Sequence, residues 1–191
     1  RAAIAVAGGT TPGPIFDDLC AAELDWGNVC VMASDERWVP EDSDRSNAKL
    51  IRSRLLTNRA AEAQFLPFYT HGLEPDDAIE SLSEKVRGQG GLAVALLGMG
   101  TDMHTASLFP GTMGLEEALA PDAPVLSVLR PHSQPEARVS LSARVLDAAI
   151  AKHLVIFGEE KRRALEKAMT LPPEEAPIQA VLSETTVHWA P

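Results

Sequence analysis

The residues with the clearest chemical potential are Asp102 and His104, which stand two apart just after an apolar segment. Residues 92–97 form an uninterrupted apolar run, typical of a parallel strand covered on both faces, although periodicity alone leaves a short buried helix open. Gly98 and Gly100 follow and permit a tight turn close to a ligand. Such a turn would bring an acid and an imidazole together at the carboxyl end of a strand, where open α/β sheets bind their ligands.

This Asp–His pair has two interpretations. Taken alone, it is more often a hydrogen-bonded structural histidine than a catalytic one. A neutral imidazole that is oriented by a carboxylate can also act as a general base toward water. The choice depends on what the other segments of the chain place around it.

A second candidate site follows the first predicted strand. Residues 1–7 are mostly apolar and lead into the turn 8–13, Gly-Gly-Thr-Thr-Pro-Gly, before an amphipathic helix. Hydroxyl groups and the N–H groups of a helix start can bind phosphate, which makes Gly9, Thr10 and Thr11 candidate anion-binding residues. The turn matches neither a Walker motif nor GxGxxG, so a plain strand-to-helix connection is the alternative.

Two cations also follow predicted strands. Arg37 stands two residues after Asp35, beyond the predicted strand 28–33. It belongs either to a surface cluster of ion pairs or to a binding site. Lys161 stands near the start of the helix that follows strand 153–157, where its charge opposes the helix dipole unless an anion lies between them. Both residues are therefore candidates for binding an anion.

The elements that would position these residues alternate along the chain. Such alternation predicts an α/β fold, a three-layer α/β/α sandwich with a mostly parallel, Rossmann-like sheet. Residues 138–142 alternate polar with apolar, as in a half-buried strand. The predicted strands cover residues 1–7, 28–33, 65–68, 92–97, 124–129, 138–142, 153–157 and 185–189, and the predicted helices cover residues 14–19, 47–56, 75–87, 115–119, 143–151 and a segment from 159.

Length and charge limit the class of protein. A chain of 191 residues suits one domain, residues 1–191. The net charge of −10 argues against a nucleic-acid partner, because such proteins offer a basic face to phosphates. No segment approaches the roughly 18 consecutive apolar residues of a membrane span. We therefore expect no membrane partner.

The cysteines and histidines indicate neither a metal nor a disulfide. Cys20 and Cys30 are the only cysteines, and their spacing fits no metal motif. The five histidines form no HxxxH or HExxH pattern. We expect no metal, no cofactor and a reduced, cytoplasmic setting.

The run 97–111, Leu-Gly-Met-Gly-Thr-Asp-Met-His-Thr-Ala-Ser-Leu-Phe-Pro-Gly, closely resembles the signature of the 6-phosphogluconolactonases, enzymes of the pentose phosphate pathway. Two further blocks are similar to that family: the Gly-Gly-Thr-Thr-Pro turn and the run 35–40, Asp-Glu-Arg-x-Val-Pro, with the Ser-Asn pair 46–47 and Arg52 after it. A weaker block around Arg138 resembles a Pro-x-x-Arg-hydroxyl pattern. The resemblance spans residues 3–189.

Two departures from the family stand out. Met103 occupies a position where the family usually has glycine. If the turn requires positive φ there, a side chain costs about 1–2 kcal/mol and could misplace His104; with negative φ it costs little. We also expect that the N-terminal helical segment which family members carry before the first strand is missing from this chain.

The resemblance implies hydrolysis of 6-phospho-D-glucono-1,5-lactone to 6-phospho-D-gluconate. It implies that His104 is the general base, that Asp102 orients it, and that Asp35 and Arg37 belong to the catalytic group, with Arg37 or a backbone N–H stabilising the oxyanion. The expected partner is a sugar-phosphate lactone, and the expected assembly is a monomer or weak homodimer. The residues expected to bind substrate and phosphate are Gly9, Thr10, Thr11, Arg37, Arg138 and Lys161.

Two alternatives stay open. A glucosamine-6-phosphate deaminase or isomerase is similar in fold and in this loop, but tends to have Ile-Ala-Phe-Asn-Glu-Pro-Gly where residues 105–111 read Thr-Ala-Ser-Leu-Phe-Pro-Gly. A non-catalytic sugar-phosphate sensor domain is the other alternative. No helix-turn-helix pattern or basic segment in the sequence supports it.

Overall fold

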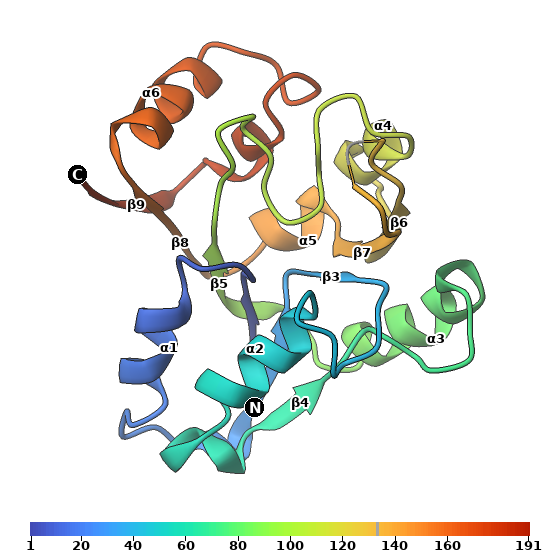
Figure 1. Cartoon of the computed structure of the whole chain (residues 1–191), viewed down its shortest axis with the longest axis vertical. Helices are drawn as coiled ribbons and strands as arrows, with labels where there is room; N and C mark the ends of the chain where they lie inside the picture. The colour runs from blue at the N-terminus through green and yellow to red at the C-terminus, as the bar shows by residue number, and fades with distance from the viewer. Residues whose placement is uncertain (133) are drawn as a thin grey trace.

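The centre of the fold is a six-stranded sheet. A computed structural model describes residues 1–132 and 134–191 and gives the strand order β4-β2-β1-β5-β8-β9, with every neighbouring pair parallel. The carboxyl ends of these strands therefore lie along one edge of the sheet (Figure 1). The strands are β1 (Ala2–Val6), β2 (Val29–Ala33), β4 (Gln64–Leu66), β5 (Leu92–Leu97), β8 (Ala151–Phe157) and β9 (Thr185–Ala190).

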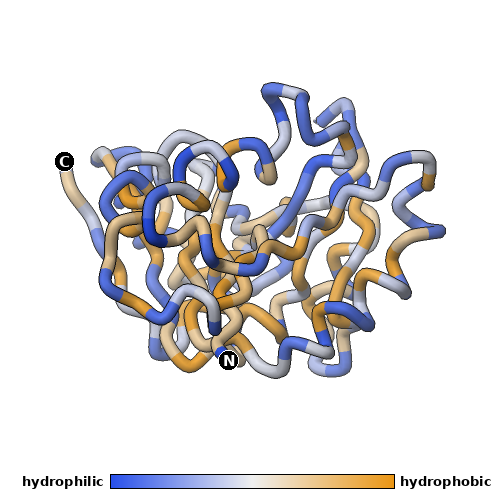
Figure 2. Tube along the Cα trace, turned by 90° about the horizontal axis from the view of Figure 1, so that it is seen from below, coloured by the Kyte–Doolittle hydropathy of each residue, from blue (hydrophilic) through white to orange (hydrophobic). Residues whose placement is uncertain are grey.

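Helices pack on both faces of this sheet. On one face, α1 (Gly13–Leu19) and α2 (Asn47–Arg54) bury apolar side chains against β1 and β2. On the other face, α3 (Pro75–Arg87), α5 (Ala143–Asp147) and α6 (Glu159–Ala168) share a core with the strands. Hydrophobic residues accordingly gather in the interior of the chain trace in Figure 2. The predicted three-layer sandwich with a mostly parallel sheet is confirmed.

A second sheet was not predicted. It has three antiparallel strands in the order β3-β7-β6, namely β3 (Asp35–Arg37), β7 (Arg138–Leu141) and β6 (Leu126–Leu129). The strand predicted at 138–142 is confirmed as β7, but the prediction that it is half-buried was wrong, because all four residues of β7 are buried, including Arg138 and Ser140. Alternation of polar and apolar residues does not indicate an exposed face here, because the polar side chains have hydrogen-bond or ion-pair partners inside the protein.

The remaining elements are short. Helix α4 (Leu115–Leu119) packs with Leu108 and Leu129 in a small core of its own. The 3-10 helices are η1 (Trp26–Asn28), η2 (Asn58–Glu62) and η3 (Pro177–Val181). Helix α5 ends at Asp147 and β8 begins at Ala151, so the predicted helix 143–151 was too long. No helix in the described part of the chain is long and apolar enough to cross a membrane.

Candidate active site

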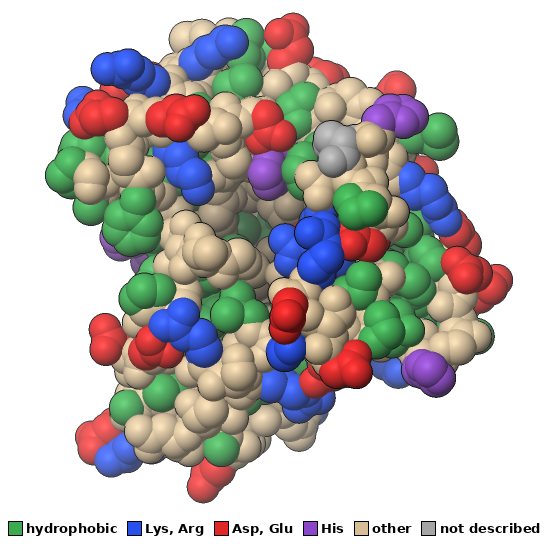
Figure 3. All heavy atoms as spheres, in the orientation of Figure 1, with side chains coloured by type: hydrophobic (Ala, Val, Ile, Leu, Met, Phe, Trp, Pro, Cys, Tyr) green, Lys and Arg blue, Asp and Glu red, His purple; other side chains and the backbone are tan. Residues whose placement is uncertain are grey.

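A cavity of about 300 Å³ opens at the carboxyl edge of the large sheet. Its walls come from residues that follow β1, β2 and β5, from the segment that enters β7 and from the first turn of α6. Figure 3 shows a hollow on this face with Lys, Arg and His side chains near it. The two sheets thus meet at one pocket, which lies where open α/β sheets bind their ligands.

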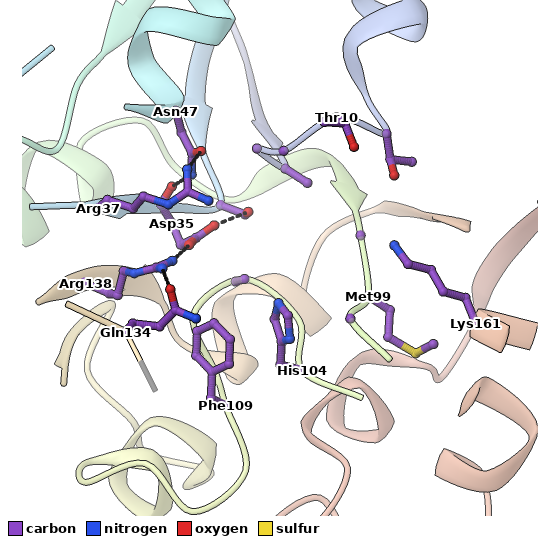
Figure 4. Close-up of a pocket in the computed structure, with 18 residues that line it drawn as sticks. Thr10, Asp35, Arg37, Asn47, Met99, His104, Phe109, Gln134, Arg138 and Lys161 are labelled. Atoms are coloured by element: carbon purple, nitrogen blue, oxygen red, sulfur yellow. Dashed lines mark hydrogen bonds and ion pairs between the residues drawn. The ribbon is translucent and has the colours of Figure 1, made fainter. Parts of the chain in front are cut away.

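The His104 ring is held by a hydrogen bond at Nδ1 and by stacking on one face. Its Nδ1 lies 2.5 Å from Oδ1 of Asp102, and the same oxygen accepts a hydrogen bond of 3.3 Å from the His104 backbone N–H. The ring stacks on Phe109 with the centroids 4.1 Å apart. Among the described residues Nε2 has no hydrogen-bond partner, so this nitrogen is available to a ligand (Figure 4).

Asp102 is held as a carboxylate. Partial burial acts to raise the pKa of Asp102, but the hydrogen bonds from His104 and, when the ring is protonated, its charge outweigh the burial and leave that pKa below its ordinary value. A carboxylate at Nδ1 keeps the proton on that nitrogen. Nε2 is then the unprotonated, basic nitrogen of the neutral ring.

The turn that carries His104 depends on close backbone packing. Gly100 accepts a hydrogen bond from the Met103 N–H (2.9 Å) and donates one to the His104 carbonyl (3.1 Å). A Cβ added at Gly100 would lie 2.3 Å from the His104 ring and 2.5 Å from Asp102 Oδ1. Glycine is therefore required here so that the imidazole can lie against the backbone.

Met103 has a φ of 66°, in the left-handed region. A side chain in this conformation costs about 1–2 kcal/mol. The conformation is held by neighbours: the Met103 carbonyl accepts a 3.1 Å hydrogen bond from Ile178, and the side chain packs on the main core. The strain is present, yet His104 keeps its contacts with Asp102 and Phe109.

Asp35 and Arg138 form a buried pair beside the pocket. Asp35 Oδ2 accepts a hydrogen bond of 2.5 Å from Ser107 Oγ and lies 3.8 Å from Arg138 Nη1, while Ser34 donates to Oδ1 at 3.2 Å. Arg138 also donates to Gln134. Burial lowers the pKa of Arg138 and Asp35 opposes the change, so the guanidinium stays charged near neutral pH.

A second group of anion-binding candidates lies across the pocket from this pair. In Figure 4 the Lys161 side chain extends from α6 on the same side of the pocket as Thr10, whereas Arg37 and Arg138 lie on the other side. Lys161 forms no ion pair with any residue that the structure describes. Because Pro12 and Pro14 lack an N–H group, the start of α1 offers fewer donors than expected, and the threonine hydroxyls and Lys161 matter more.

The structure brings the predicted site residues together. Asp102 lies behind His104 and contacts its ring rather than the cavity. The predicted absence of a metal stays a prediction, although within residues 1–132 and 134–191 no three potential metal-ligating side chains converge. The predicted residues that line the cavity are Gly9, Thr10, Thr11, Asp35, Arg37, His104, Arg138 and Lys161.

Comparison with known proteins identifies the family. The model of the glucosamine-6-phosphate isomerases/6-phosphogluconolactonase family matches residues 1–189. The chain belongs to this family. Its relatives include the 6-phosphogluconolactonase of Rhizobium meliloti, 40% identical over all of this chain and 85% of the relative, and that of Pseudomonas aeruginosa, 37% identical over all of this chain and 82% of the relative.

Solved structures of the family share the fold. A 6-phosphogluconolactonase from Shewanella baltica is 32% identical and superposes with a TM-score of 0.94, covering 99% of this chain and 83% of that one. The enzyme from Thermotoga maritima is 28% identical, with a TM-score of 0.83 over 99% of this chain and 84% of the other. The second, antiparallel sheet thus lies inside a region of shared fold.

Sequence reasoning gave no role to several residues of this family member's pocket. Asn47 and Phe109 lay within segments that resemble the family, but only their contacts with Arg37 and His104 reveal what they do. Gln134 lies in the loop between the predicted strands 124–129 and 138–142, and no sequence signal pointed to it. Ser107 donates to Asp35 from outside the cavity lining.

The first prediction concerns Gly100. The Gly100→Ala substitution should push the His104 ring away from Phe109, because the new Cβ would overlap the imidazole. Histidine-labelled NMR should then show the His104 ring protons losing the upfield shift that stacking on Phe109 imposes.

Gly98→Ala is the matched control. Its Cβ would find nothing nearer than Ala7 Cβ at 3.8 Å, so the His104 signals should stay in place. An unshifted His104 in Gly100→Ala would contradict the packing described for this turn.

Proposed function

We propose that this protein is a 6-phosphogluconolactonase, which hydrolyses 6-phospho-D-glucono-1,5-lactone to 6-phospho-D-gluconate. The observation that carries the proposal is His104, whose Nδ1 is held by Asp102 and whose other ring nitrogen is free at a cation-lined pocket. Membership of the family and relatives named 6-phosphogluconolactonase at up to 41% identity support it.

The chemistry needs one base and one group that stabilises negative charge. Water attacks the lactone carbonyl carbon while Nε2 of His104 accepts its proton, and Asp102 stabilises the imidazolium that forms. The oxyanion of the tetrahedral intermediate lies against Arg37 or a backbone N–H. The bond to the ring oxygen then breaks and the imidazolium returns the proton to that oxygen, which becomes a hydroxyl group. The carboxylic acid that is formed releases its own proton to solvent and becomes a carboxylate.

Asp35 contributes through its partners in this proposal. Its carboxylate is already engaged by Ser34, Ser107 and Arg138, so it fixes the Arg138 guanidinium at the edge of the pocket. The phosphate group of the substrate is bound by the cations and hydroxyls that face the cavity. These are Arg138 and Lys161, with Thr10, Thr11 and the backbone at Gly9, and Arg37 is within the same cavity.

The segment after His104 argues against the deaminase alternative. Residues 105–111 contain no carboxylate, whereas the deaminase form of this loop carries one. The hydroxyls in the segment are used internally, since Thr105 donates to the Gly98 carbonyl and Ser107 donates to Asp35. Nothing in the segment can replace the missing acid.

A coupled assay tests the proposal directly. Freshly prepared 6-phosphogluconolactone is added, and the product is followed with 6-phosphogluconate dehydrogenase after subtraction of spontaneous hydrolysis. A rate proportional to protein concentration is expected. Binding of the sugar phosphate without any turnover would favour the sensor alternative instead.

His104→Asn should lower kcat by roughly 100-fold or more with little change in KM, because the base is lost while the phosphate contacts remain. In the parent, kcat/KM should also fall toward acid pH, since a protonated imidazole cannot accept the proton of water. Steady-state kinetics across pH measures both effects. Rates within a few-fold of the parent would remove His104 from the mechanism.

Lys161→Ala should raise KM for the phosphorylated lactone by about 10- to 100-fold, the loss expected for one charged hydrogen bond. Unphosphorylated gluconolactone should show a much smaller loss in the same variant. Lys167→Ala, on the same helix but outside the cavity, is the control for charge alone. Equal losses on both lactones would contradict the phosphate assignment.

Met103→Gly tests whether the positive φ at this position misplaces the base. Because His104 keeps its contacts with Asp102 and Phe109, we expect kcat to stay within about 3-fold of the parent, far from the roughly 100-fold effect of a misplaced catalytic group. A large gain in kcat at constant KM would show instead that methionine displaces His104.

A further inference from the structure

Glu36 is a buried carboxylate that does not touch the cavity. Its side chain is almost fully buried, and it is absent from the cavity lining. One carboxylate oxygen accepts the backbone N–H groups of Arg37 (2.9 Å) and Asn47 (2.8 Å). The other accepts the N–H of Ala48 (2.7 Å) and the hydroxyl of Ser46 (3.2 Å). Both oxygens are therefore fully used inside the protein.

These contacts tie β3 to the first turn of α2. A carboxylate at a helix N-terminus satisfies N–H groups that have no partner in the helix and interacts favourably with the helix dipole. Burial raises the pKa of Glu36, while the N–H groups of Asn47 and Ala48 oppose the rise. Glu36 therefore fixes the position of Asn47 relative to the backbone of β3.

The Asn47 side chain connects this buried cluster to the cavity. Its side-chain amide donates to the Asp35 carbonyl at 2.7 Å, and its Oδ1 accepts from Arg37 Nη1 at 3.0 Å. A Cβ added at Gly8 would lie 2.0 Å from Oδ1 of Asn47, so the amide occupies space that only a glycine leaves open. The asparagine is packed, bonded at both ends and directed at Arg37.

Among the residues that the structure describes, Arg37 is held only by neutral acceptors. Besides Asn47 Oδ1, its Nη1 donates to the Arg45 carbonyl at 2.7 Å. Its Nε is buried without a hydrogen-bond partner among residues 1–132 and 134–191, and no carboxylate of that part of the chain forms an ion pair with it. Arg138, by contrast, has Asp35 beside it.

We propose that Glu36 and Asn47 are positioning residues that hold Arg37 with its charge uncompensated, so that it stabilises the oxyanion formed on the lactone. Carbonyl-type acceptors restrain a long, flexible side chain without neutralising it, whereas a carboxylate partner would do both. A preorganised cation is most effective where charge develops in the transition state. The role at the oxyanion rests on the proposed lactonase function; the restraint of Arg37 does not.

Asn47→Asp tests the need for a neutral acceptor. The variant keeps the oxygen that Arg37 uses but adds a negative charge and removes the donor to Asp35. We expect kcat to fall by about 100-fold with KM changed by less than about 3-fold, since the loss concerns transition-state charge. Asn58→Asp, which adds the same charge outside the cavity lining, is the matched control.

A double-mutant cycle identifies the residue through which Asn47 acts. In an Arg37→Met background the further loss caused by Asn47→Asp should be less than about 3-fold, because no guanidinium remains to be neutralised. A further loss as large as in the parent would overturn the proposal. So would an unchanged kcat in Asn47→Asp itself.

The restraint of Arg37 is also measurable without substrate. In ¹⁵N NMR of arginine side chains, the buried Nε–H of Arg37, assigned from its absence in Arg37→Met, should exchange slowly with water in the parent. Glu36→Gln replaces one acceptor oxygen with a donor, and Asn47→Ala removes the amide; both should accelerate this exchange by at least about 10-fold while the unfolding midpoint shows a folded protein.

The two arms separate the proposals. Accelerated exchange in the two variants, together with no lactonase activity in the parent protein, would leave the positioning of Arg37 standing and defeat the proposed function. Unchanged exchange in both variants would overturn the positioning role whatever the activity.

Discussion

The junction of the two sheets buries three charged side chains, Asp35, Glu36 and Arg138, and the site depends on how each is satisfied. An unpaired charge in such a place costs several kcal/mol, so each must have partners. Asp35 and Arg138 partner one another with the help of Ser107, and Glu36 is bonded by N–H groups. The antiparallel pairing of β3 with β7 brings Asp35 opposite Ser140 and Arg37 opposite Arg138. This pairing sets the cationic wall of the pocket.

The parallel sheet and the small sheet therefore contribute different parts of the pocket. The parallel sheet ends in the turns that carry the threonine hydroxyls and His104, whose position follows from a strand end and a glycine. The small sheet contributes Arg37 and Arg138, whose long side chains need external restraint, and the start of α2 contributes Asn47, which restrains Arg37. A base and a cation from different layers can then face one substrate.

Sequence patterns predicted the parallel sheet because strands such as β1, β5 and β8 contain apolar runs and alternate with helices along the chain. They did not predict the small sheet: β3 consists of Asp35, Glu36 and Arg37, which a binary pattern reads as a solvated loop. The candidate site was largely predictable because its residues follow strand ends or lie in family motifs. The roles of Asn47 and Gln134 were not, since each depends on a hydrogen bond to an arginine that only the tertiary fold brings near.

The chain is acidic overall and still has a cationic pocket, because only some of its basic side chains are paired with carboxylates. On the surface, arginines such as Arg54 and Arg130 are paired with carboxylates, and exposed pairs of this kind add little to the local potential. In the part of the chain that the structure describes, Arg37 and Lys161 form no ion pair, and both face the cavity. Positive potential therefore concentrates in the cavity, where low-dielectric walls strengthen it. The charge of the ligand is set by the cations that lack a carboxylate partner, and not by the net charge of the chain.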